Sequence, residues 1–391
     1  MSNYTDNAEM GKDIFATANI IVAGVTGAGK STLINAVFGK EFAATGKGRP
    51  ITQEISEYKS QDVPVKIWDS VGFEIGNDSN GVSKTITSIK KIKETIKEQS
   101  VKDNTEHIHA IWYCINQGSG RYQQTEADFV KELHSVGVPF IIVITQCTDP
   151  DDIFAKAVDE LNRKNGLTDI QVIEVLAQEK KYRNGSIDPV FGLDNLVNKT
   201  LEMLPVFVKS SFIAGQKIST VLKREECEKI IMKYEDLAEK GLLDKIPGIN
   251  IISTNDKFRQ MLKEIFITYN QIISEDNCKK IEFDLSKDYS SDLYWWCIVP
   301  SRFTTQEKKL AKLMEDIKNK RANGLELKER NNSYFLQPAR LITFYGYTLL
   351  CAVEDVWEMI NNEIIRNMEE DIIPQIRERI RYYLGKRKRN E

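Results

Sequence analysis

The sequence predicts a molecule in two parts, an α/β half with a mainly parallel sheet between helices and then an all-α half. Up to about Pro205, short apolar runs alternate with amphipathic stretches, which is the pattern of βαβ units. Beyond Pro205 the strand signal fades and long helical patterns follow. We therefore expect an N-terminal segment over residues 1–16, an α/β domain over residues 17–207, and a helical domain with a basic tail over residues 208–391.

Five apolar runs rich in β-branched residues predict the strands of the sheet. They are Asn19–Ala23, Val63–Trp68, Ala110–Ile115, Phe140–Thr145 and Gln171–Leu176. Helical patterns lie between these runs, one after Lys30 and the others over about Val82–Ser100, Thr125–Ser135 and Leu193–Leu204. This alternation predicts helices that connect and cover the strands.

Amphipathic patterns also organise the helical half. One helical face carries Ile230, Ile231, Tyr234 and Leu237, and a second carries Phe258, Leu262, Ile265 and Tyr269. Between these two helical patterns, residues 246–252 contain the pair Pro247-Gly248, which predicts a turn. Pro374 is expected to open a last helix with an apolar stripe of Ile376, Ile380 and Leu384.

Composition excludes several classes of protein. With 41% hydrophobic and 28% charged residues, the 391-residue chain is neither disordered nor a disulfide scaffold. A net charge of -3 gives no chain-wide attraction to nucleic acid or anionic lipid. Six singly spaced cysteines and three histidines argue against structural zinc, and scattered thiols without an N-terminal apolar segment favour a reducing, cytoplasmic location. The uncharged stretch Leu341–Val353 is too short to cross a bilayer.

The strongest motif is a phosphate-binding loop that directly follows the first predicted strand. GVTGAGKST, Gly24–Thr32, fits G-x-x-x-x-G-K-[ST] and precedes a helix-forming segment. Its backbone N–H groups and the helix start can surround a phosphate chain. Lys30 can reach the β- and γ-phosphates, and Ser31 can coordinate magnesium. The expected contact residues are Gly24, Thr26, Gly27, Ala28, Gly29, Lys30, Ser31 and Thr32.

A second motif, WDSVG, ends the next predicted strand. Asp69 lies where it can hold magnesium through water, and Gly72 can offer its N–H to the γ-phosphate. A solvated aspartate at a strand end is the alternative when the motif is taken alone. The loop upstream favours the nucleotide interpretation.

Together, GVTGAGKSTLINAVFG and DSVGF resemble the septin-like, immunity-related and dynamin-like branch of the translation-factor-related GTPases. The resemblance covers residues 17–205 and implies a Ras-like G domain of the P-loop NTPase fold. It implies that Thr52, in a Gly/Pro-rich loop, is the first-switch threonine that closes over magnesium and the γ-phosphate. It also implies that Ala177 packs against the base.

The base-recognition segment departs from the family motif Asn/Thr-Lys-x-Asp. In TQCTD, Thr145 and Gln146 take the first two places, Thr148 falls in the place of the acid, and Asp149 comes one residue late. A one-residue bulge would bring Asp149 into place, and we expect guanine on that basis. Without the bulge, adenine or a degenerate pocket remains open.

The catalytic region departs as well. Phe73 stands where Ras-like switches carry the glutamine that orients the attacking water, and Gly27 replaces the asparagine of potassium-activated relatives. We therefore predict slow intrinsic hydrolysis, accelerated by homodimerisation across the nucleotide face. Arg121 is a candidate stabilising charge, against the alternative of an ordinary surface arginine.

Past Pro205 no second catalytic motif appears, so this half is expected to be an output domain. The cluster Leu293–Pro300, LYWWCIVP, is either core or a membrane contact. Arg377, Arg379 and Arg381 precede the basic run Lys386–Arg389. Three interpretations of this tail stay open: it binds an anionic membrane or a protein effector, it binds nucleic acid, or it is a solvated chain end. Nucleic acid is the least favoured partner.

The sequence as a whole predicts a magnesium-dependent switch that binds GTP and hydrolyses it to GDP and phosphate. Lys30, Thr52 and Gly72 are the expected catalytic residues, and Ser31, Thr52 and Asp69 the expected magnesium ligands. Gln146, Asp149 and Ala177 are expected at the base. Two other readings stay open: a nucleotide-gated scaffold with little hydrolysis or relaxed base choice, and a dynamin-like protein peripheral to a membrane.

Overall fold

The computed structural model describes residues 15–39, 49–52, 55–59, 64–70, 84–119, 122–148, 153–239, 256–287 and 337–385. They form two compact units that divide between Thr220 and Val221. We call the first the sheet unit and the second the helical unit.

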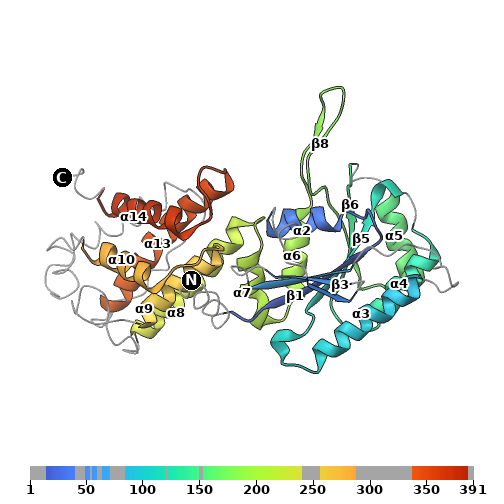
Figure 1. Ribbon diagram of the computed structural model, residues 1–391, viewed down its shortest axis with the longest axis horizontal. Coiled ribbons are helices and arrows are strands. Elements are labelled where there is room, and N and C mark those ends of the chain that lie inside the picture. Colours follow the sequence, from blue (N-terminus) through green and yellow to red (C-terminus); the bar gives the residue numbers. More distant parts are fainter. Residues whose placement is uncertain are drawn as a thin grey trace. The chain divides into compact units, whose positions relative to one another are not determined.

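A seven-stranded sheet forms the centre of the sheet unit, in the order β2-β3-β4-β1-β5-β6-β7 (Figure 1). The five strands that run parallel are β1 (Ala18–Gly24), β4 (Val65–Ser70), β5 (Ala110–Asn116), β6 (Phe140–Thr145) and β7 (Gln171–Glu174). They coincide with the five runs predicted from the sequence. Because they are parallel, their carboxyl ends meet at one edge of the sheet, where the phosphate-binding loop follows β1.

Two antiparallel strands, β2 (Arg49–Thr52) and β3 (Ile55–Lys59), extend the sheet beyond β4. The sequence did not predict them, since short edge strands with polar residues lack the continuous apolar run of buried central strands. Thr52, expected in a loop, lies instead in β2 and pairs with Ile55 of β3. The loop assignment for Thr52 was therefore wrong.

Helices cover both faces of the sheet (Figure 1). Their bounds are α2 (Lys30–Phe38), α3 (Lys84–Ser100), α4 (Gln124–His134), α5 (Ile153–Lys164), α6 (Leu193–Met203) and α7 (Val206–Gly215), with short 3-10 turns η1 (Asn104–Glu106) and η2 (Gln117–Ser119). Ile111 and Tyr113 of β5 face a core shared with α3, α4 and α5. Trp112 points to the other face, where it stacks on Phe38 of α2 and donates its indole N–H to Thr200 of α6.

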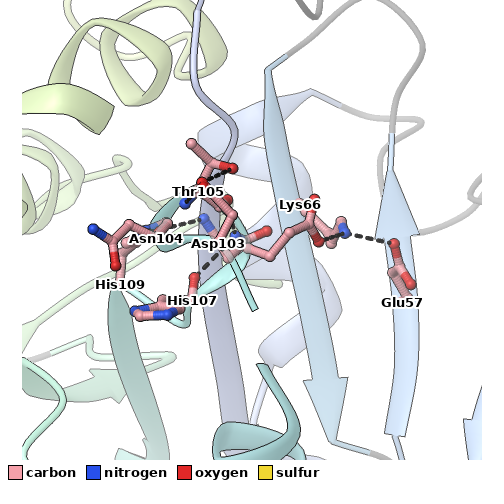
Figure 2. Close-up of polar contacts among 9 residues, drawn as sticks. Glu57, Lys66, Asp103, Asn104, Thr105, His107 and His109 are labelled. Atoms are coloured by element: carbon pink, nitrogen blue, oxygen red, sulfur yellow. Dashed lines mark hydrogen bonds and ion pairs between the residues drawn. The ribbon is translucent and has the colours of Figure 1, made fainter. Parts of the chain in front are cut away.

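The amino-terminal edge of the sheet is fixed by a buried polar network (Figure 2). The backbone N–H of Asn19 donates to Nδ1 of His109 over 3.0 Å, and Nε2 of His109 lies 3.0 Å from the carbonyl of Asn104. The Asn19 amide donates to the carbonyls of Thr105 and His107. Burial lowers the pKa of His109. We assign His109 a structural role as a neutral ring that ties β1 to the turn before β5.

Lys66 adds an ionic link to the same edge. Its ammonium lies 3.3 Å from Glu57 of β3 and 3.2 Å from Glu106 of η1 (Figure 2). These contacts hold the edge opposite the phosphate-binding loop. They link β4 to β3 and to the turn before β5.

A small antiparallel hairpin interrupts the chain between β7 and α6. It consists of β8 (Lys180–Lys181) and β9 (Ile187–Asp188), and it projects from the rest of the sheet unit (Figure 1). Gly185 in its turn has φ of 87°, in the left-handed region. The sequence did not predict this hairpin, because two-residue strands have no detectable periodicity.

The described residues of the helical unit contain helices and no strand. The helices are α8 (Thr220–Glu239), α9 (Asp256–Thr268), α10 (Glu275–Lys287), α13 (Gln337–Asn361) and α14 (Glu369–Gly385). Edge-to-face ring contacts join α9 to α13 through Phe258 and Tyr345, and Tyr269, just past α9, meets Trp357 of α13. Gly346 of α13 lies so close to α8 that a Cβ there would sit 2.7 Å from Ile231. The all-α prediction for this half is confirmed.

The start of the last helix differs from the prediction. Pro374 does not open α14, because the helix begins at Glu369 and contains Pro374 in its second turn. The carbonyl of Met368 accepts the N–H groups of Asp371 and Ile372, and acidic residues in the first turn favour the positive end of the helix dipole. Burial of Ile376 and Ile380 offsets the backbone hydrogen bond lost at the proline.

Several predicted features lie outside the described residues: Phe73, Arg121, the turn at 246–252, the aromatic cluster at 293–300 and the basic run at 386–389. Among the helices that the structure describes, none is long and apolar enough to cross a membrane. Leu341–Val353 lies within α13, where Leu349, Leu350 and Val353 are fully buried.

Candidate functional site

The phosphate-binding loop connects β1 to α2 through left-handed glycines. Gly27 and Gly29 have φ of 82° and 78°, and Gly29 caps α2 in the left-handed conformation. A Cβ at Gly24 would lie 2.5 Å from the carbonyl oxygen of Cys114 on β5. Only glycine fits there, so the loop can turn tightly over the sheet edge and present the N-terminus of α2 to an anion.

Lys30 folds back over this loop. It is 8% exposed, and its ammonium donates to the carbonyls of Gly24 and Val25 over 2.9 and 3.2 Å. Burial lowers the pKa of Lys30, while the nearby charge of Asp69 opposes the shift. A buried cation whose hydrogen bonds, among the described residues, go to neutral carbonyls would gain free energy from an anionic ligand, and a phosphate chain supplies that charge.

Asp69 lies beside this lysine at the carboxyl end of β4. Its register opposite Val22 of β1 places it next to the loop. It is 8% exposed, and its Oδ1 is buried without a hydrogen-bond partner among the residues that the structure describes. Burial raises the pKa of Asp69 to about 6, against the opposing charge of Lys30. An unsatisfied buried carboxylate oxygen is costly, so binding of a cation or a hydrogen-bond donor at this oxygen would be favourable.

These residues fit a magnesium ion bound together with a nucleotide. Mg²⁺ takes oxygen ligands and is usually held by one or two protein groups plus phosphates and waters. Asp69 offers a buried oxygen without a partner, and Ser31 is exposed at the second position of α2. In the part of the chain that the structure describes, no cluster of three or more His, Cys, Asp or Glu side chains could hold a metal. Asp69 and Ser31 thus supply the one or two protein oxygens that a phosphate-bound magnesium ion uses.

The end of β6 is tied to the phosphate-binding loop. The Thr145 hydroxyl donates to the carbonyl of Ala28 over 2.6 Å. Gln146 has φ of 53°, and its amide donates to the carbonyl of Gly27 over 3.2 Å. Asn116, at the end of β5, donates to the same carbonyl over 3.3 Å. Three strand ends thus converge on one loop, and Gln146 lies against the loop where the family motif has lysine.

The residues after Gln146 are also held from two sides. Cys147 is fully buried, and its N–H donates to the carbonyl of Val175. The N–H of Thr148 donates over 2.8 Å to the side chain of Gln117. Ala177 follows a bridge between Leu176 and Phe191 and is half-buried. Asp149 lies outside the described residues, so its candidate role stays a prediction.

The structure brings together most of the residues expected from the sequence. The loop residues, Lys30, Ser31, Asp69 and Gln146 gather at the carboxyl edge of the sheet. Thr26 and Thr32 are exposed at this edge. Thr52 is described only through its backbone in β2, and Gly72 lies outside the described residues. Their roles stay predictions.

Sequence reasoning missed Asn116 and Gln117. Both follow β5, which was predicted correctly, and both contact the segments of the site. The available signal was positional, since polar residues after neighbouring parallel strands meet at one edge of the sheet.

A family model described as "50S ribosome-binding GTPase" matches residues 19–146. This span contains β1, the phosphate-binding loop, Asp69 and the Thr145–Gln146 pair. The matched span has the P-loop GTPase fold, a mainly parallel sheet with flanking helices.

Solved structures with similar G domains have low identity to this chain. They include a probable GTP-binding protein engB (17% identity, TM-score 0.31, covering 48% of this chain and 98% of that chain). A bacterial selenocysteine-specific elongation factor EF-Sec also matches, with 16% identity and a TM-score of 0.29, covering 48% of this chain and 29% of that chain. Era from Aquifex aeolicus matches with 18% identity and a TM-score of 0.31, covering 56% of this chain and 68% of that chain. No curated protein matches the chain. The fold assignment rests on the strand order and the family match.

Proposed function

We propose that the protein is a magnesium-dependent switch that binds GTP and hydrolyses it slowly to GDP and phosphate. The observation that carries this proposal is the arrangement of Lys30 and Asp69 around the glycine loop. Among the described residues, a buried ammonium bonded to backbone carbonyls lies near a buried carboxylate oxygen that has no hydrogen-bond partner. Together they form a site prepared for a phosphate and its cation.

Each residue has a chemical role in this proposal. The loop N–H groups and Lys30 bind and orient the phosphates, and Lys30 would stabilise charge that develops on the transferred group. Ser31, Thr52 and Asp69 would hold Mg²⁺, which neutralises phosphate charge when bound. Gly72 would donate its N–H to the γ-phosphate.

Guanine is the proposed base. Gln146 would cover one face of the purine, Ala177 would pack against it, and Asp149 would accept from the guanine N–H groups if the chain bulges there. The contact of Gln146 with the Gly27 carbonyl supports its place beside the loop.

Dimerisation and output are further parts of the proposal. With Phe73 in place of a water-orienting glutamine, a second G domain facing the nucleotide would complete the catalytic site. The γ-phosphate would order the segments around Thr52 and Gly72 and change what the helical unit presents. Membership of the septin-like, immunity-related or dynamin-like branch belongs to this proposal too.

The partner of the helical unit is proposed to be a protein effector or an anionic membrane surface, with the protein cytoplasmic or peripheral to a membrane. The family description names ribosome binding, but the matched residues end at 146 and do not include this unit. Arg377 and Arg381 pair with Asp284 inside the unit. The basic run 386–389 is therefore the better lipid candidate, and flotation of anionic vesicles with and without residues 386–391 tests it.

Calorimetry with GDP, a non-hydrolysable GTP analogue and the matching ATP analogue tests the main proposal. We expect binding of both guanine nucleotides that strengthens with Mg²⁺, and slow phosphate release from GTP. Equal or tighter binding of the ATP analogue would contradict the guanine assignment. The absence of any nucleotide binding would contradict the function itself.

A specific observation favours a second candidate, a nucleotide-gated scaffold with negligible turnover. Phe73 stands where the water-orienting glutamine would be, and Thr148 and Gln146 depart from the family motif at the base. A site altered in this way could bind without hydrolysing. Tight GTP binding with no phosphate release under any condition would support this candidate.

A further inference from the structure

The helix that begins at the phosphate-binding loop ends against the segment that leads into α8. α2 carries Lys30 at its first position. In its last turn, the carbonyl of Val37 accepts the N–H of Lys217 over 2.7 Å. A Cβ at Gly39, directly after α2, would lie 2.8 Å from the Lys217 ammonium. We call residues 216–219, which belong to the sheet unit, the connector. The far end of α2 is thus bonded to the connector.

One buried side chain fixes the shape of the connector. Gln216 is 0% exposed, and its side-chain oxygen accepts the N–H groups of Ile218 and Ser219, both over 2.7 Å. Its side-chain nitrogen donates to the carbonyls of Ile213 in α7 and of Ser219, over 3.3 and 2.9 Å. A glutamine amide offers two donors and two acceptor positions, so all four are used. The end of α7 and the residue before α8 are therefore held in one turn.

Ring contacts join the same end of α2 to the core of the sheet unit. Phe38, the last residue of α2, stacks on Trp112 of β5 and meets Phe212 of α7 edge to face, with ring centroids 5.9 and 6.1 Å apart. Trp112 and Phe212 also meet edge to face. Close-packed interiors transmit strain because they have little room to absorb it. α2, β5 and α7 thus form one packed group, and the connector continues from it.

We propose that a phosphate bound at the start of α2 orders the connector at its end, with Gln216 and Lys217 as the positioning residues of this link. This inference rests on the proposed nucleotide site. An anion at the N-terminus of a helix and a cation at its C-terminus both interact favourably with the helix dipole, and Lys217 supplies the cation beside Gly39. A ligand that orders one end of a short helix lowers the entropy cost of the contacts at the other end.

The link reaches the first residues of the helical output. α8 begins at Thr220, directly after the connector, so an ordered connector would present the start of this helix in a fixed conformation. Coupling between two sites is reciprocal in its free energy. The intact connector should therefore strengthen nucleotide binding by the same factor by which nucleotide orders the connector.

Hydrogen exchange followed by mass spectrometry, in the full-length protein with and without GDP and Mg²⁺, measures the link. The N–H groups of residues 216–219 should exchange at least about fivefold more slowly with GDP, the lower end of typical coupling between sites. The turn at residues 165–167 is the internal control, because it is also closed by backbone hydrogen bonds but follows α5 rather than α2. Equal slowing in both segments would indicate general stabilisation and overturn the link.

Variants of the connector test the reciprocal effect. Gln216→Ala should lose the slowing caused by GDP and should weaken GDP binding, measured by calorimetry, by at least about fivefold. Gln99→Ala, at a buried glutamine of α3, is the matched control and should keep the GDP affinity. Lys217→Ala keeps the backbone hydrogen bond to Val37 and removes the ammonium of a half-buried side chain, so it should fold and show a smaller loss of both.

The outcomes separate the link from the nucleotide site. Thermal melting shows which variants are folded, and Lys217→Ala together with the wild-type exchange decides if Gln216→Ala does not fold. Unchanged GDP affinity in the folded connector variants would overturn the link and leave the nucleotide site intact. An equal loss of affinity in Gln99→Ala would assign the effect to general stability and also overturn the link. A wild type that binds no GDP would contradict the proposed function, and the link would be wrong with it.

Discussion

Asp69 is expected to destabilise the nucleotide-free protein and to contribute to magnesium binding when nucleotide is present. Its carboxyl group is buried beside Lys30, and one of its oxygens has no hydrogen-bond partner in the described part of the chain. Burial raises its pKa from 3.8 to about 6. Buried groups with a strongly shifted pKa are typical of binding sites, where a bound ligand satisfies them. A magnesium ion with its waters would satisfy Asp69.

The pH dependence of stability follows from this pKa. Because the folded protein holds the proton more tightly than the unfolded chain, Asp69 destabilises the nucleotide-free protein above pH 6. This cost disappears as the pH falls from about 6 towards 4. Asp69→Asn should therefore stabilise the apo protein at pH 7.5, by at most about 3 kcal/mol at 1.36 kcal/mol per pKa unit. The gain over wild type should shrink on acidification.

Urea unfolding of wild type and Asp69→Asn from pH 4 to pH 8 measures this difference. Asp159→Asn is the control, since Asp159 forms an exposed ion pair with Arg163 on α5. A stability difference that does not change with pH would contradict the buried, raised-pKa carboxyl. Mg²⁺ should strengthen GDP binding in the wild type and have less effect in Asp69→Asn.

Lys30→Ala should remove nucleotide binding. The buried ammonium is the only charge that the described loop residues bring to the phosphates. Hydrogen bonds to charged groups contribute about 1.5 to 3 kcal/mol each, so we expect at least about a 100-fold loss of GDP affinity. Lys90→Ala is the matched control, because its side chain is 75% exposed on α3. Calorimetry measures both, and unchanged affinity in Lys30→Ala would show that the loop does not bind phosphate.

At the scale of elements, the sequence predicted the buried central strands and missed the edge strands and the hairpin. The central strands were correct because Phe140–Thr145 and its neighbours are buried on both faces and read as continuous apolar runs. The edge strands β2 and β3 and the β8–β9 hairpin were missed because their positions are set by pairing and by a turn, which leave little periodicity in the sequence. The same limit applies to the site. The glycine loop has a local motif, but the hydrogen bond between Gln117 and Thr148 exists only in the folded chain.

The joint between α10 and α14 offers a prediction at this scale. Asp284, 6% exposed on α10, pairs with Arg377 and with Arg381 of α14, the latter over 3.2 Å. Asp284→Asn leaves two guanidinium groups without their carboxylate and should destabilise the helical unit by about 1 to 3 kcal/mol. This value is lower than for a fully buried ion pair because Arg381 is largely exposed, and solvent weakens its interaction. The control Asp276→Asn lies on the same helix, where its side chain is 85% exposed. Urea unfolding followed by circular dichroism compares them, and equal midpoints would contradict a stabilising pair.

At the scale of the whole molecule, the net charge of -3 conceals how the charges are used. Arginines that form a basic stripe in the sequence are paired with acids in the structure, as Arg377 and Arg381 are with Asp284. The helical unit therefore uses part of its positive charge for its own stability. These arginines are therefore less available to a partner than the sequence alone indicates.

Switching by dimerisation makes a prediction about concentration. If a second G domain completes the catalytic site, GTP turnover per molecule should rise with protein concentration and level off once the dimer is saturated. The test measures phosphate release over about a 100-fold range of protein concentration. Light scattering with GDP and with the GTP analogue gives the molecular mass under the same conditions. A range of this width detects dimer association that differs by about 1.4 kcal/mol for each factor of ten. Lys30→Ala, which should not bind nucleotide, is the control for dimers that form without it. Turnover that stays constant across this range, in a protein that remains monomeric with the GTP analogue, would contradict dimer activation and leave a site that must position its water within one chain.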